Sequence, residues 1–182
     1  NWTKNEKNGK GTYYATNNNK YVGTWYRNHK EGKGIMYFYN GDRYEGSWKN
    51  DKRNGEGTYY YQSGAYYKGS WVDDQKEGKG IFDWKDGSKY EGEWAKNMRN
   101  GRGTYFYADG DYYNGEWKND MQDGRGIYKF RNGDTYEGQY LMGERTGMGT
   151  FRFANGDSYV GNFLNGEQNG QGTFQWKGVA TY

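Results

Sequence analysis

Few residues in this chain could support catalysis or metal binding, and most of those recur at a fixed interval. The tetrad Gly9-Lys10-Gly11-Thr12 resembles part of a phosphate-binding loop, but its glycine spacing differs and the same pattern returns along the chain. His29 is the only histidine and there is no cysteine, so one chain cannot build a usual zinc site. Carboxylates follow a turn glycine at Asp42, Asp111, Asp134 and Asp157. No singular acid–base pair stands out, and we expect no enzymatic activity, cofactor or metal.

Basic residues are the stronger signal, because they form two columns that share one period. The first column contains Lys7, Lys30, Arg53, Lys76 and Arg99. The second, three residues further on, contains Lys10, Lys33, Lys79, Arg102 and Arg125. Rows of like charge attract anionic lipid headgroups by about 1 kcal/mol per residue. We expect one positive edge that is a candidate site for anionic lipid. The alternative is solvation with local pairing, because Glu31, Glu77 and Asp123 lie between the columns.

A strict repeat must position these columns. The chain has 182 residues, with 32 Gly, 22 Tyr and 8 Trp, and few aliphatic residues. Disordered chains are usually poor in aromatics, so the composition favours an ordered aromatic and glycine protein. The motif Tyr-x-Gly starts every 23 residues, at Tyr21, Tyr44, Tyr67, Tyr90, Tyr113, Tyr136 and Tyr159. An aromatic follows each motif, at Trp25, Trp48, Trp71, Trp94, Trp117, Tyr140 and Phe163.

Each repeat has the pattern of a β-hairpin. Residues 44–48 alternate as in a half-buried strand, residues 49–54 are the expected loop, and residues 55–61 form the second strand. Turns such as Asn40-Gly41 favour hairpins, because both residues accept a positive φ. The fold class is therefore all-β: an elongated, single-layer antiparallel β meander of about eight 23-residue hairpin repeats. One face carries an aromatic ladder that includes Trp25, Trp48, Trp71, Trp94 and Trp117. The opposite face is mixed, and we expect it to be largely solvated.

The order Tyr-x-Gly-x-Trp, Asn/Asp, Gly-x-Gly, Asn-Gly-Asp resembles the MORN repeat (membrane occupation and recognition nexus). The resemblance covers residues 1–182 as a single array. The chain opens in mid-repeat, so we expect it to be a fragment of a longer array. Its Asn- and Lys-rich composition and the length of the array most resemble the apicomplexan MORN-repeat scaffold proteins of the parasite cytoskeleton. The resemblance implies phosphoinositide binding and membrane attachment.

The C-terminal end differs from the other repeats, because the basic columns fade and aliphatic residues appear there. We expect residues 139–182 to form a tail-to-tail homodimer through Leu141, Met142, Met148, Phe163 and Leu164. Closed two-fold symmetry is the commonest way to bury one self-complementary patch. The competing interpretation is an end cap that folds back on its own sheet.

These patterns favour a non-enzymatic structural scaffold or adaptor that self-associates and links protein partners to membrane-associated cytoskeleton. The alternatives are a peripheral phosphoinositide-binding membrane module and a regulatory peptide-binding array of a larger enzyme. The expected partners are a second copy, cytoskeletal or membrane proteins, and anionic phospholipid. Nucleic acid is not expected, because the net charge is only +3 and the aromatics are expected to be used in packing. The expected location is cytoplasmic, at the cytoskeleton or membrane periphery.

Overall fold

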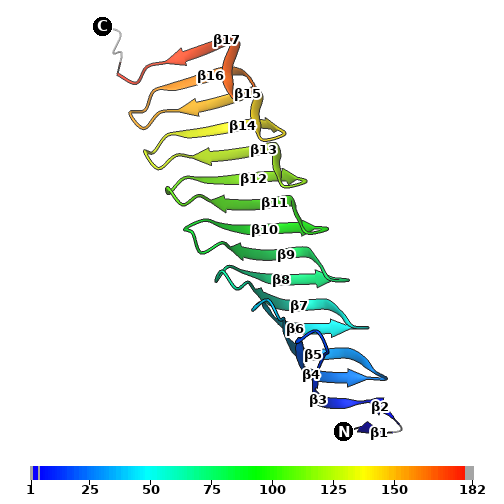
Figure 1. Ribbon diagram of the computed structural model, residues 1–182. Helices are drawn as coiled ribbons and strands as arrows, with labels where there is room; N and C mark the ends of the chain where they lie inside the picture. Colours follow the sequence, from blue (N-terminus) through cyan, green and yellow to red (C-terminus); the bar gives the residue numbers. More distant parts are fainter. Residues whose placement is uncertain (1, 4, 179–182) are drawn as a thin grey trace. The chain divides into compact units, whose positions relative to one another are not determined.

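The computed structural model describes residues 2–3 and 5–178 (Figure 1). In this part of the chain every regular element is a β-strand. Strands β3 to β17 form an antiparallel sheet of 15 strands in which each strand pairs with its neighbours in sequence. Strands β1 (Trp2–Thr3) and β2 (Glu6–Lys7) form a separate pair. The prediction of a single-layer antiparallel meander of hairpin repeats is therefore confirmed.

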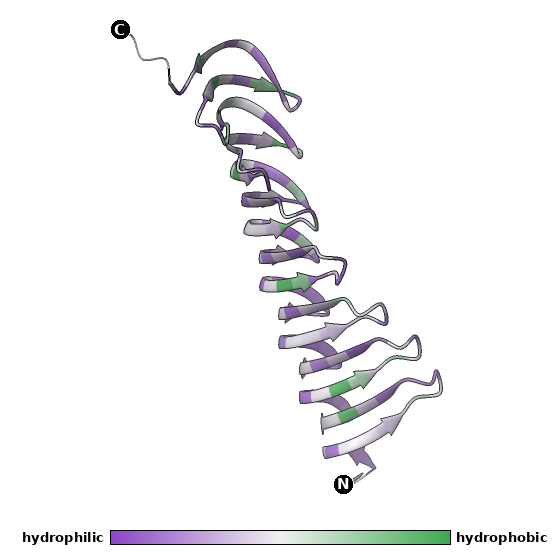
Figure 2. Ribbon diagram, turned by 90° about the vertical axis from the view of Figure 1, so that its left-hand side faces the viewer, coloured by the Kyte–Doolittle hydropathy of each residue, from purple (hydrophilic) through white to green (hydrophobic). Residues whose placement is uncertain are grey.

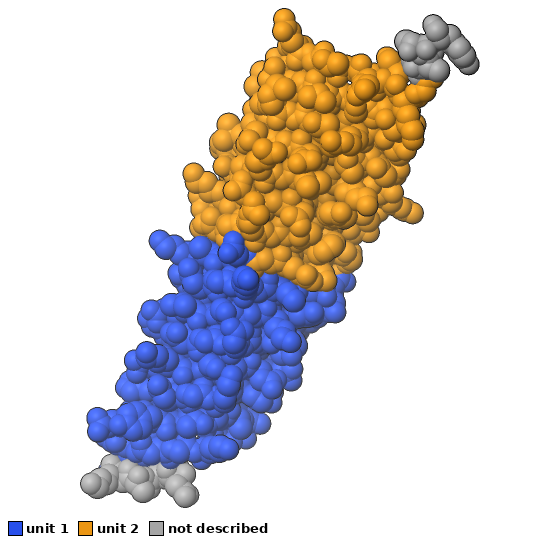
Figure 3. Space-filling model, turned by 180° about the vertical axis from the view of Figure 1, so that it is seen from behind, with its two compact units in different colours: residues 1–85, 93–97 blue, residues 86–92, 98–182 orange. Residues whose placement is uncertain are grey.

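The chain divides into two compact units, residues 1–85 with 93–97 and residues 86–92 with 98–182 (Figure 3). The first contains β3 (Gly9–Tyr14), β4 (Lys20–Tyr26), β5 (His29–Tyr37), β6 (Arg43–Lys49), β7 (Lys52–Tyr60), β8 (Tyr66–Val72) and β9 (Gln75–Asp83). Residues of β10 (Lys89–Ala95) belong to both units. The second contains β11 (Met98–Phe106), β12 (Tyr112–Lys118), β13 (Met121–Lys129), β14 (Thr135–Leu141), β15 (Glu144–Arg152), β16 (Ser158–Leu164) and β17 (Glu167–Gln175).

The loop expected over residues 49–54 is in fact a two-residue turn. Lys49 pairs with Lys52, and only Asn50 and Asp51 connect β6 to β7. Both turn residues are left-handed, with φ of 48° and 68°, as a type I′ hairpin turn requires. Asn and Asp tolerate this conformation better than other non-glycine residues. The sequence prediction was wrong about the length of this loop, because residues 52–54 are polar but belong to β7.

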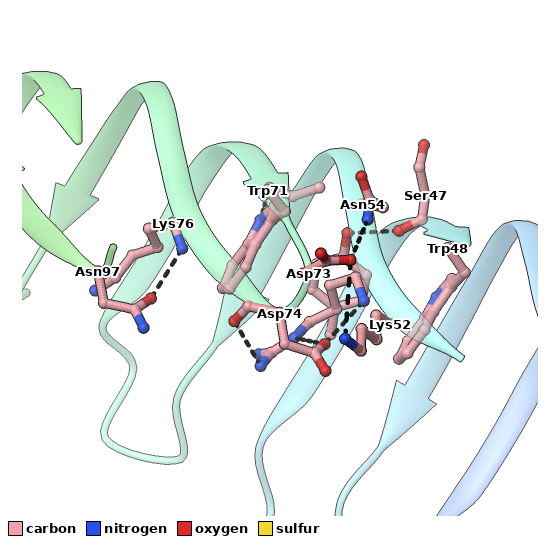
Figure 4. Close-up of polar contacts among 12 residues, drawn as sticks. Ser47, Trp48, Lys52, Asn54, Trp71, Asp73, Asp74, Lys76 and Asn97 are labelled. Atoms are coloured by element: carbon pink, nitrogen blue, oxygen red, sulfur yellow. Dashed lines mark hydrogen bonds and ion pairs between the residues drawn. The ribbon is translucent and has the colours of Figure 1, made fainter. Parts of the chain in front are cut away.

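The second residue of this turn also connects successive repeats. Asp74, the equivalent of Asp51, accepts a hydrogen bond at Oδ1 from the backbone N–H of Arg53, at 2.8 Å. Its own N–H donates to the carbonyl oxygen of Arg53, at 3.0 Å. Asn97 receives the same bond from the N–H of Lys76, at 2.8 Å (Figure 4). A carboxylate or amide at this position therefore holds each turn against the preceding repeat.

The Asn-Gly motif forms a different turn from the expected two-residue one. Phe38 accepts a hydrogen bond from the N–H of Gly41 and donates one to the carbonyl oxygen of Asp42, both at 3.0 Å. Residues 39–41 are therefore a three-residue loop in which Gly41, with φ of 91°, supplies the left-handed residue. Asn40 acts through its side chain, whose Oδ1 accepts a bond from the N–H of Asp42 at 3.0 Å.

The longer strand of each hairpin contains a bulge. In the β6–β7 pair, Gly46 lies opposite Gly57, but Trp48 lies opposite Arg53, so β7 has two extra residues between these pairs. Gly55 lies in this segment with φ of 92°, a value that side chains rarely adopt. Bulges bend a strand and increase its twist. The first glycine of Gly-x-Gly therefore serves the bulge.

The core is aromatic rather than aliphatic, and Figure 2 accordingly shows only short hydrophobic stretches on the ribbon. Tyr44 is fully buried and Trp71 is 3% exposed. The Tyr44 ring meets Trp48 and Trp71 edge-to-face, at centroid distances of 5.1 and 5.4 Å. In the second unit Tyr113 meets Trp117 at 5.2 Å and Tyr140 at 5.0 Å in the same way. Edge-to-face pairs are the favoured geometry for rings at these distances, so each repeat buries its tyrosine between two neighbours.

Candidate interaction surfaces

The strand register assigns every side chain to one of two faces. The ladder face carries Tyr44, Trp48 and their equivalents in the other repeats. Because side chains alternate along a strand, Arg43, Glu45 and Ser47 lie on the opposite face, which we call the open face. In Figure 4, Trp48 and Ser47 point away from each other on the two sides of β6. The candidate site residues can be placed against this division.

The first basic column lies on the ladder face and is occupied by internal contacts. The guanidinium carbon of Arg53 lies 4.5 Å from the Trp71 ring centroid, and its Nε donates to Asp74 Oδ1 at 2.9 Å. Arg99 repeats both contacts with Trp117, at 4.5 Å, and Asp120, at 3.1 Å. Only 20% of each arginine side chain is exposed. The same aromatic contacts are made by Lys7, Lys30 and Lys76. The side chains of this column therefore pack over the tryptophan rings of the ladder.

The second basic column lies on the open face. Lys33 pairs with Ser47, and Arg102 pairs with Glu116, both residues of the open face. All five members, Lys10, Lys33, Lys79, Arg102 and Arg125, are exposed. The two columns thus lie on opposite faces, and the expectation that they form one positive edge was wrong. The spacing of three residues could have revealed this, because residues an odd number apart on a strand point to opposite faces, and the two extra residues of the bulge leave that alternation unchanged.

The recurrent carboxylates hold the three-residue loops. Burial works against the charge of Asp42, but hydrogen bonds from Tyr59, from the N–H of Gln62 and from Asn40 hold the pKa of its carboxyl below the ordinary value. The Tyr59 hydroxyl donates at 2.7 Å. Asp111 has the same partners in the second unit, Tyr128 at 2.7 Å and the N–H of Arg131 at 2.8 Å. A carboxylate with these bonds is satisfied by its own loop and by the next repeat, and it connects the two structurally.

His29 contacts the turn of the next repeat. Its Nδ1 lies 2.5 Å from Asp51 Oδ2. Within the described residues, no group of three or more His, Asp and Glu side chains could hold a metal ion. The described residues also contain no helix long and apolar enough to cross a membrane.

The ladder tyrosines are held in the neutral state. Burial raises the pKa of Tyr21 to about 12. The hydrogen bond to the Thr24 carbonyl has a smaller effect, which lowers the pKa. Burial likewise raises the pKa of Tyr44, Tyr67 and Tyr113 far above the ordinary value. Their hydroxyls donate to backbone carbonyls within the same repeat, as Tyr44 does to Ser47 at 3.0 Å. They are structural groups with no surface role.

The residues expected at the C-terminal interface separate into two groups. Leu141, Met148 and Leu164 lie on the open face and are between 51 and 57% exposed, and the turn residue Met142 is 66% exposed. Phe163 is only 4% exposed, because it replaces tryptophan in the ladder and packs against Tyr136 at 4.9 Å. The open face of this unit also presents Val160 and Ile127, which the sequence reasoning omitted. Their positions, out of phase with the buried residues of the same strands, could have revealed them.

Exposed tyrosines form a row that the sequence reasoning treated as solvated surface. Tyr14, Tyr37 and Tyr60 are the last residues of β3, β5 and β7. They lie on the open face and are 72, 38 and 36% exposed. Their signal in the sequence was an aromatic at the same position of three consecutive repeats, out of phase with the buried rings. The aromatics are therefore not all used in packing.

Three comparisons place the chain among known proteins. The MORN repeat model matches residues 1–20, 21–43, 44–66, 67–89, 90–112, 113–135, 136–158 and 159–178. No curated protein sequence matches with significant similarity. The solved structures with a similar fold include the TCP domain of Drosophila melanogaster SAS-4 (dCPAP), in complex with a proline-rich motif of Ana2 (dSTIL). Its TM-score is 0.40 and its identity 16%, over 92% of this chain and 90% of that one.

A second similar structure is the TCP10 domain of Danio rerio CPAP in complex with a peptide of Danio rerio STIL. Its TM-score is 0.47 and its identity 12%, over 84% of this chain and 74% of that one. At such identities and TM-scores the likeness assigns no role to this chain. The family match is different in kind, because it covers consecutive repeats from residue 1 to residue 178 in the register that the tyrosines and glycines define. The chain therefore belongs to the MORN-repeat family.

Proposed function

We propose that this chain is a non-enzymatic scaffold or adaptor that self-associates and binds protein partners through its open face. The observation that carries the proposal is the contrast between the two faces. On the ladder face the rings are buried and the first basic column is bonded to them. On the open face apolar and basic side chains remain exposed in rows. Exposed apolar rows on a repeat sheet usually mark an interaction site.

Self-association is supported by Leu141, Met148 and Leu164. Leu141 and Leu164 occupy the same position of β14 and β16, so about 10 Å separates them across two strand spacings. Met148 lies on the same face of the intervening strand β15. Phe163 is not part of the proposed interface, because it is buried in the ladder. A two-fold contact between two such patches is the arrangement that we favour.

Light scattering on the purified protein tests self-association. We expect a dimer for the wild type and a folded monomer for Leu141→Glu with Leu164→Glu. The matched control is Val72→Glu, because Val72 occupies the same position of its repeat in the other unit and is 49% exposed. That control should remain dimeric. A monomeric wild type, or a double variant that stays dimeric, would contradict the proposal.

Binding of anionic lipid is a second candidate function, and the exposure of the second basic column favours it. Sedimentation with phosphatidylcholine vesicles, with and without phosphoinositide, is the test. We expect phosphoinositide-dependent pelleting that is lost on changing Lys10, Lys33 and Lys79 to alanine. Changing the loop lysines Lys85, Lys96 and Lys177 removes the same charge from other sites and should have less effect. Equal losses in both variants would mean that only net charge matters.

A setting at the cytoskeleton or membrane periphery of the cytoplasm completes the proposal. It rests on the resemblance of this array to the apicomplexan MORN-repeat scaffold proteins. Fluorescence imaging of the tagged protein, compared with the Leu141→Glu and Leu164→Glu variant, tests whether localisation depends on self-association. A diffuse wild-type signal would contradict this setting.

A further inference from the structure

The exposed tyrosines of the first unit belong to one continuous row that runs across the strands. The register pairs Tyr14 with Lys20, Lys20 with Tyr37, Tyr37 with Arg43 and Arg43 with Tyr60. Tyr60 then pairs with Tyr66, at a ring-centroid distance of 6.3 Å. We call these six residues, Tyr14, Lys20, Tyr37, Arg43, Tyr60 and Tyr66, the tyrosine row. It therefore has one member on each strand from β3 to β8.

Cations alternate with the rings in this row. Lys20 Nζ lies 5.7 Å from the Tyr14 centroid and 5.3 Å from the Tyr37 centroid, between two rings. The Arg43 guanidinium lies 4.3 Å from the Tyr60 centroid. Among the described residues Lys20 makes no ion pair, and the nearest carboxylate to Arg43 is that of Glu45, at 4.0 Å. The row therefore offers apolar ring surface together with positive charge, of which that of Lys20 is not ion-paired.

An open groove lies beside the row and shares Tyr60 as a wall. Its volume is about 600 Å³, and the backbones of Gly46 and Gly57 are part of its lining. Lys33 and Lys68 line it together with Glu45 and Glu56, so the groove itself has no net charge and the positive charge lies in the row. A ligand chain that crosses the strands along the row can thus place residues in the groove and still contact the rings. All of these residues belong to the first unit.

The spacing of the rings matches one kind of peptide. Tyr14, Tyr37 and Tyr60 lie on alternate strands, so their repeat is about 9.6 Å, twice the usual strand spacing. A polyproline II helix advances about 9.3 Å in each turn of three residues. We infer that the tyrosine row binds a proline-rich segment of a partner protein in the polyproline II conformation, with acidic residues between its prolines. Prolines would pack on successive rings, and the acidic residues would meet Lys20 and Arg43.

The physical chemistry of each component supports this occupant. Tyrosine presents a flat apolar ring with a polar tip, which is the surface that proline-binding grooves use. A polyproline II segment is already extended, so little conformational entropy is lost when it binds. The inference names the class of partner for the proposed scaffold and therefore rests on that proposed function. A single nucleic-acid strand also stacks on rings beside cations, and the test below includes it.

The experiment is fluorescence anisotropy with a labelled peptide of four Pro-Pro-Glu repeats. At about 3.1 Å per residue it spans about 37 Å, more than the roughly 24 Å across six strands. Four Gly-Gly-Glu repeats carry the same charge without the conformation, and four Pro-Pro-Lys repeats keep the conformation and reverse the charge. We expect saturable binding of the Pro-Pro-Glu peptide, at least about tenfold tighter than that of either comparison peptide.

The variant carries Tyr14→Thr, Tyr37→Thr and Tyr60→Thr. Threonine favours strands, and Gln175, a polar residue, occupies the equivalent position of β17, so the strands should keep their conformation. We expect this variant to bind the Pro-Pro-Glu peptide at least about tenfold more weakly. The control is Tyr26→Thr with Tyr39→Thr, two tyrosines outside the row that are 56 and 76% exposed. The control should bind as the wild type does, and circular dichroism should show both variants folded.

Several results would overturn the inference: no saturable binding by the wild type, equal affinity for the Pro-Pro-Glu and Gly-Gly-Glu peptides, or unchanged binding by the row variant. Tighter binding of a 12-nucleotide oligouridylate, lost in the same variant, would assign the row to nucleic acid instead. Light scattering separates this failure from failure of the scaffold proposal, because the row lies apart in sequence from Leu141 and Leu164. A dimer that binds no peptide refutes only the tyrosine row.

Discussion

The ring of Tyr44 lies against the backbone of Gly57, on the neighbouring strand. A β-carbon at Gly57 would be 2.6 Å from Cε2 of that ring, closer than real side-chain contacts allow. The Tyr44 hydroxyl extends across Gly57 to the Ser47 carbonyl, 3.0 Å away. The second glycine of Gly-x-Gly is thus required by the ring that lies over it. The same relationship holds between Tyr113 and Gly126 in the second unit.

Gly57→Ala should therefore destabilise the protein by at least about 2 kcal/mol, because overpacking a closed core forces rings and backbone apart. Urea unfolding followed by tryptophan fluorescence measures this loss. Gly11 is the matched control, since it occupies the same position of an earlier repeat but no atom lies within 4 Å of a β-carbon there. Gly11→Ala should be nearly neutral. Equal effects would mean that the ring contact does not restrict this position.

Trp71→Ala should destabilise the protein by about 3–5 kcal/mol, the range for removing a large buried aromatic. Trp71 is 3% exposed, and its Nε1 donates to the Gly57 carbonyl at 3.2 Å. Trp71→Phe keeps a ring and loses this bond, as the natural ladder residue Phe163 does, and should cost about 1–2 kcal/mol. Chemical denaturation of both variants tests the order. A near-neutral alanine variant would contradict a buried ladder.

Arg53→Ala should lower the free energy of unfolding by about 1–2 kcal/mol, because it removes the contact with the Trp71 ring and the bond to Asp74. Lys33→Ala removes the same charge from the open face, where the side chain is exposed, and should change stability by less than about 0.5 kcal/mol. Thermal unfolding of the two variants compares the basic columns directly. Equal small effects would show that the first column is no more structural than the second.

Alkaline pH should destabilise the protein before the ladder tyrosines ionise. The pKa of Tyr21 is raised from 10.0 to about 12 by burial. A raised pKa in the folded state contributes stability that is fully present below pH 10 and is lost as the pH rises towards 12. The difference in phenolate absorbance between the wild type and Tyr21→Phe should show that Tyr21 ionises well above pH 10. Ionisation of Tyr21 near pH 10, without unfolding, would contradict this assignment.

The sequence by itself determined the repeat, the strand class and the left-handed glycine of the Asn-Gly turn. The interval of 23 residues needs no tertiary information, because each repeat contains its own turn and glycine signals. Gly41 is left-handed as expected, with φ of 91°, but its neighbour Asn40 is not among the residues with a positive φ. Buried tryptophans could likewise be anticipated, since Trp48 alternates with polar residues along its strand.

Only the tertiary structure decided what each charge contacts. Arg53 and Glu56 lie on opposite faces, as their spacing of three residues requires, but Arg53 is bonded to Trp71 and Asp74 while Glu56 is exposed opposite Ser70. The partners of Arg53 come from the next strand and its turn, so the local pattern cannot give them. Phe163 also shows that local sequence does not give burial. Its aliphatic neighbour Leu164 suggested that Phe163 was part of an exposed patch, but packing against Tyr136 buries it. The tyrosine row, too, exists only through the pairing of strands, because its members come from six strands of the sheet.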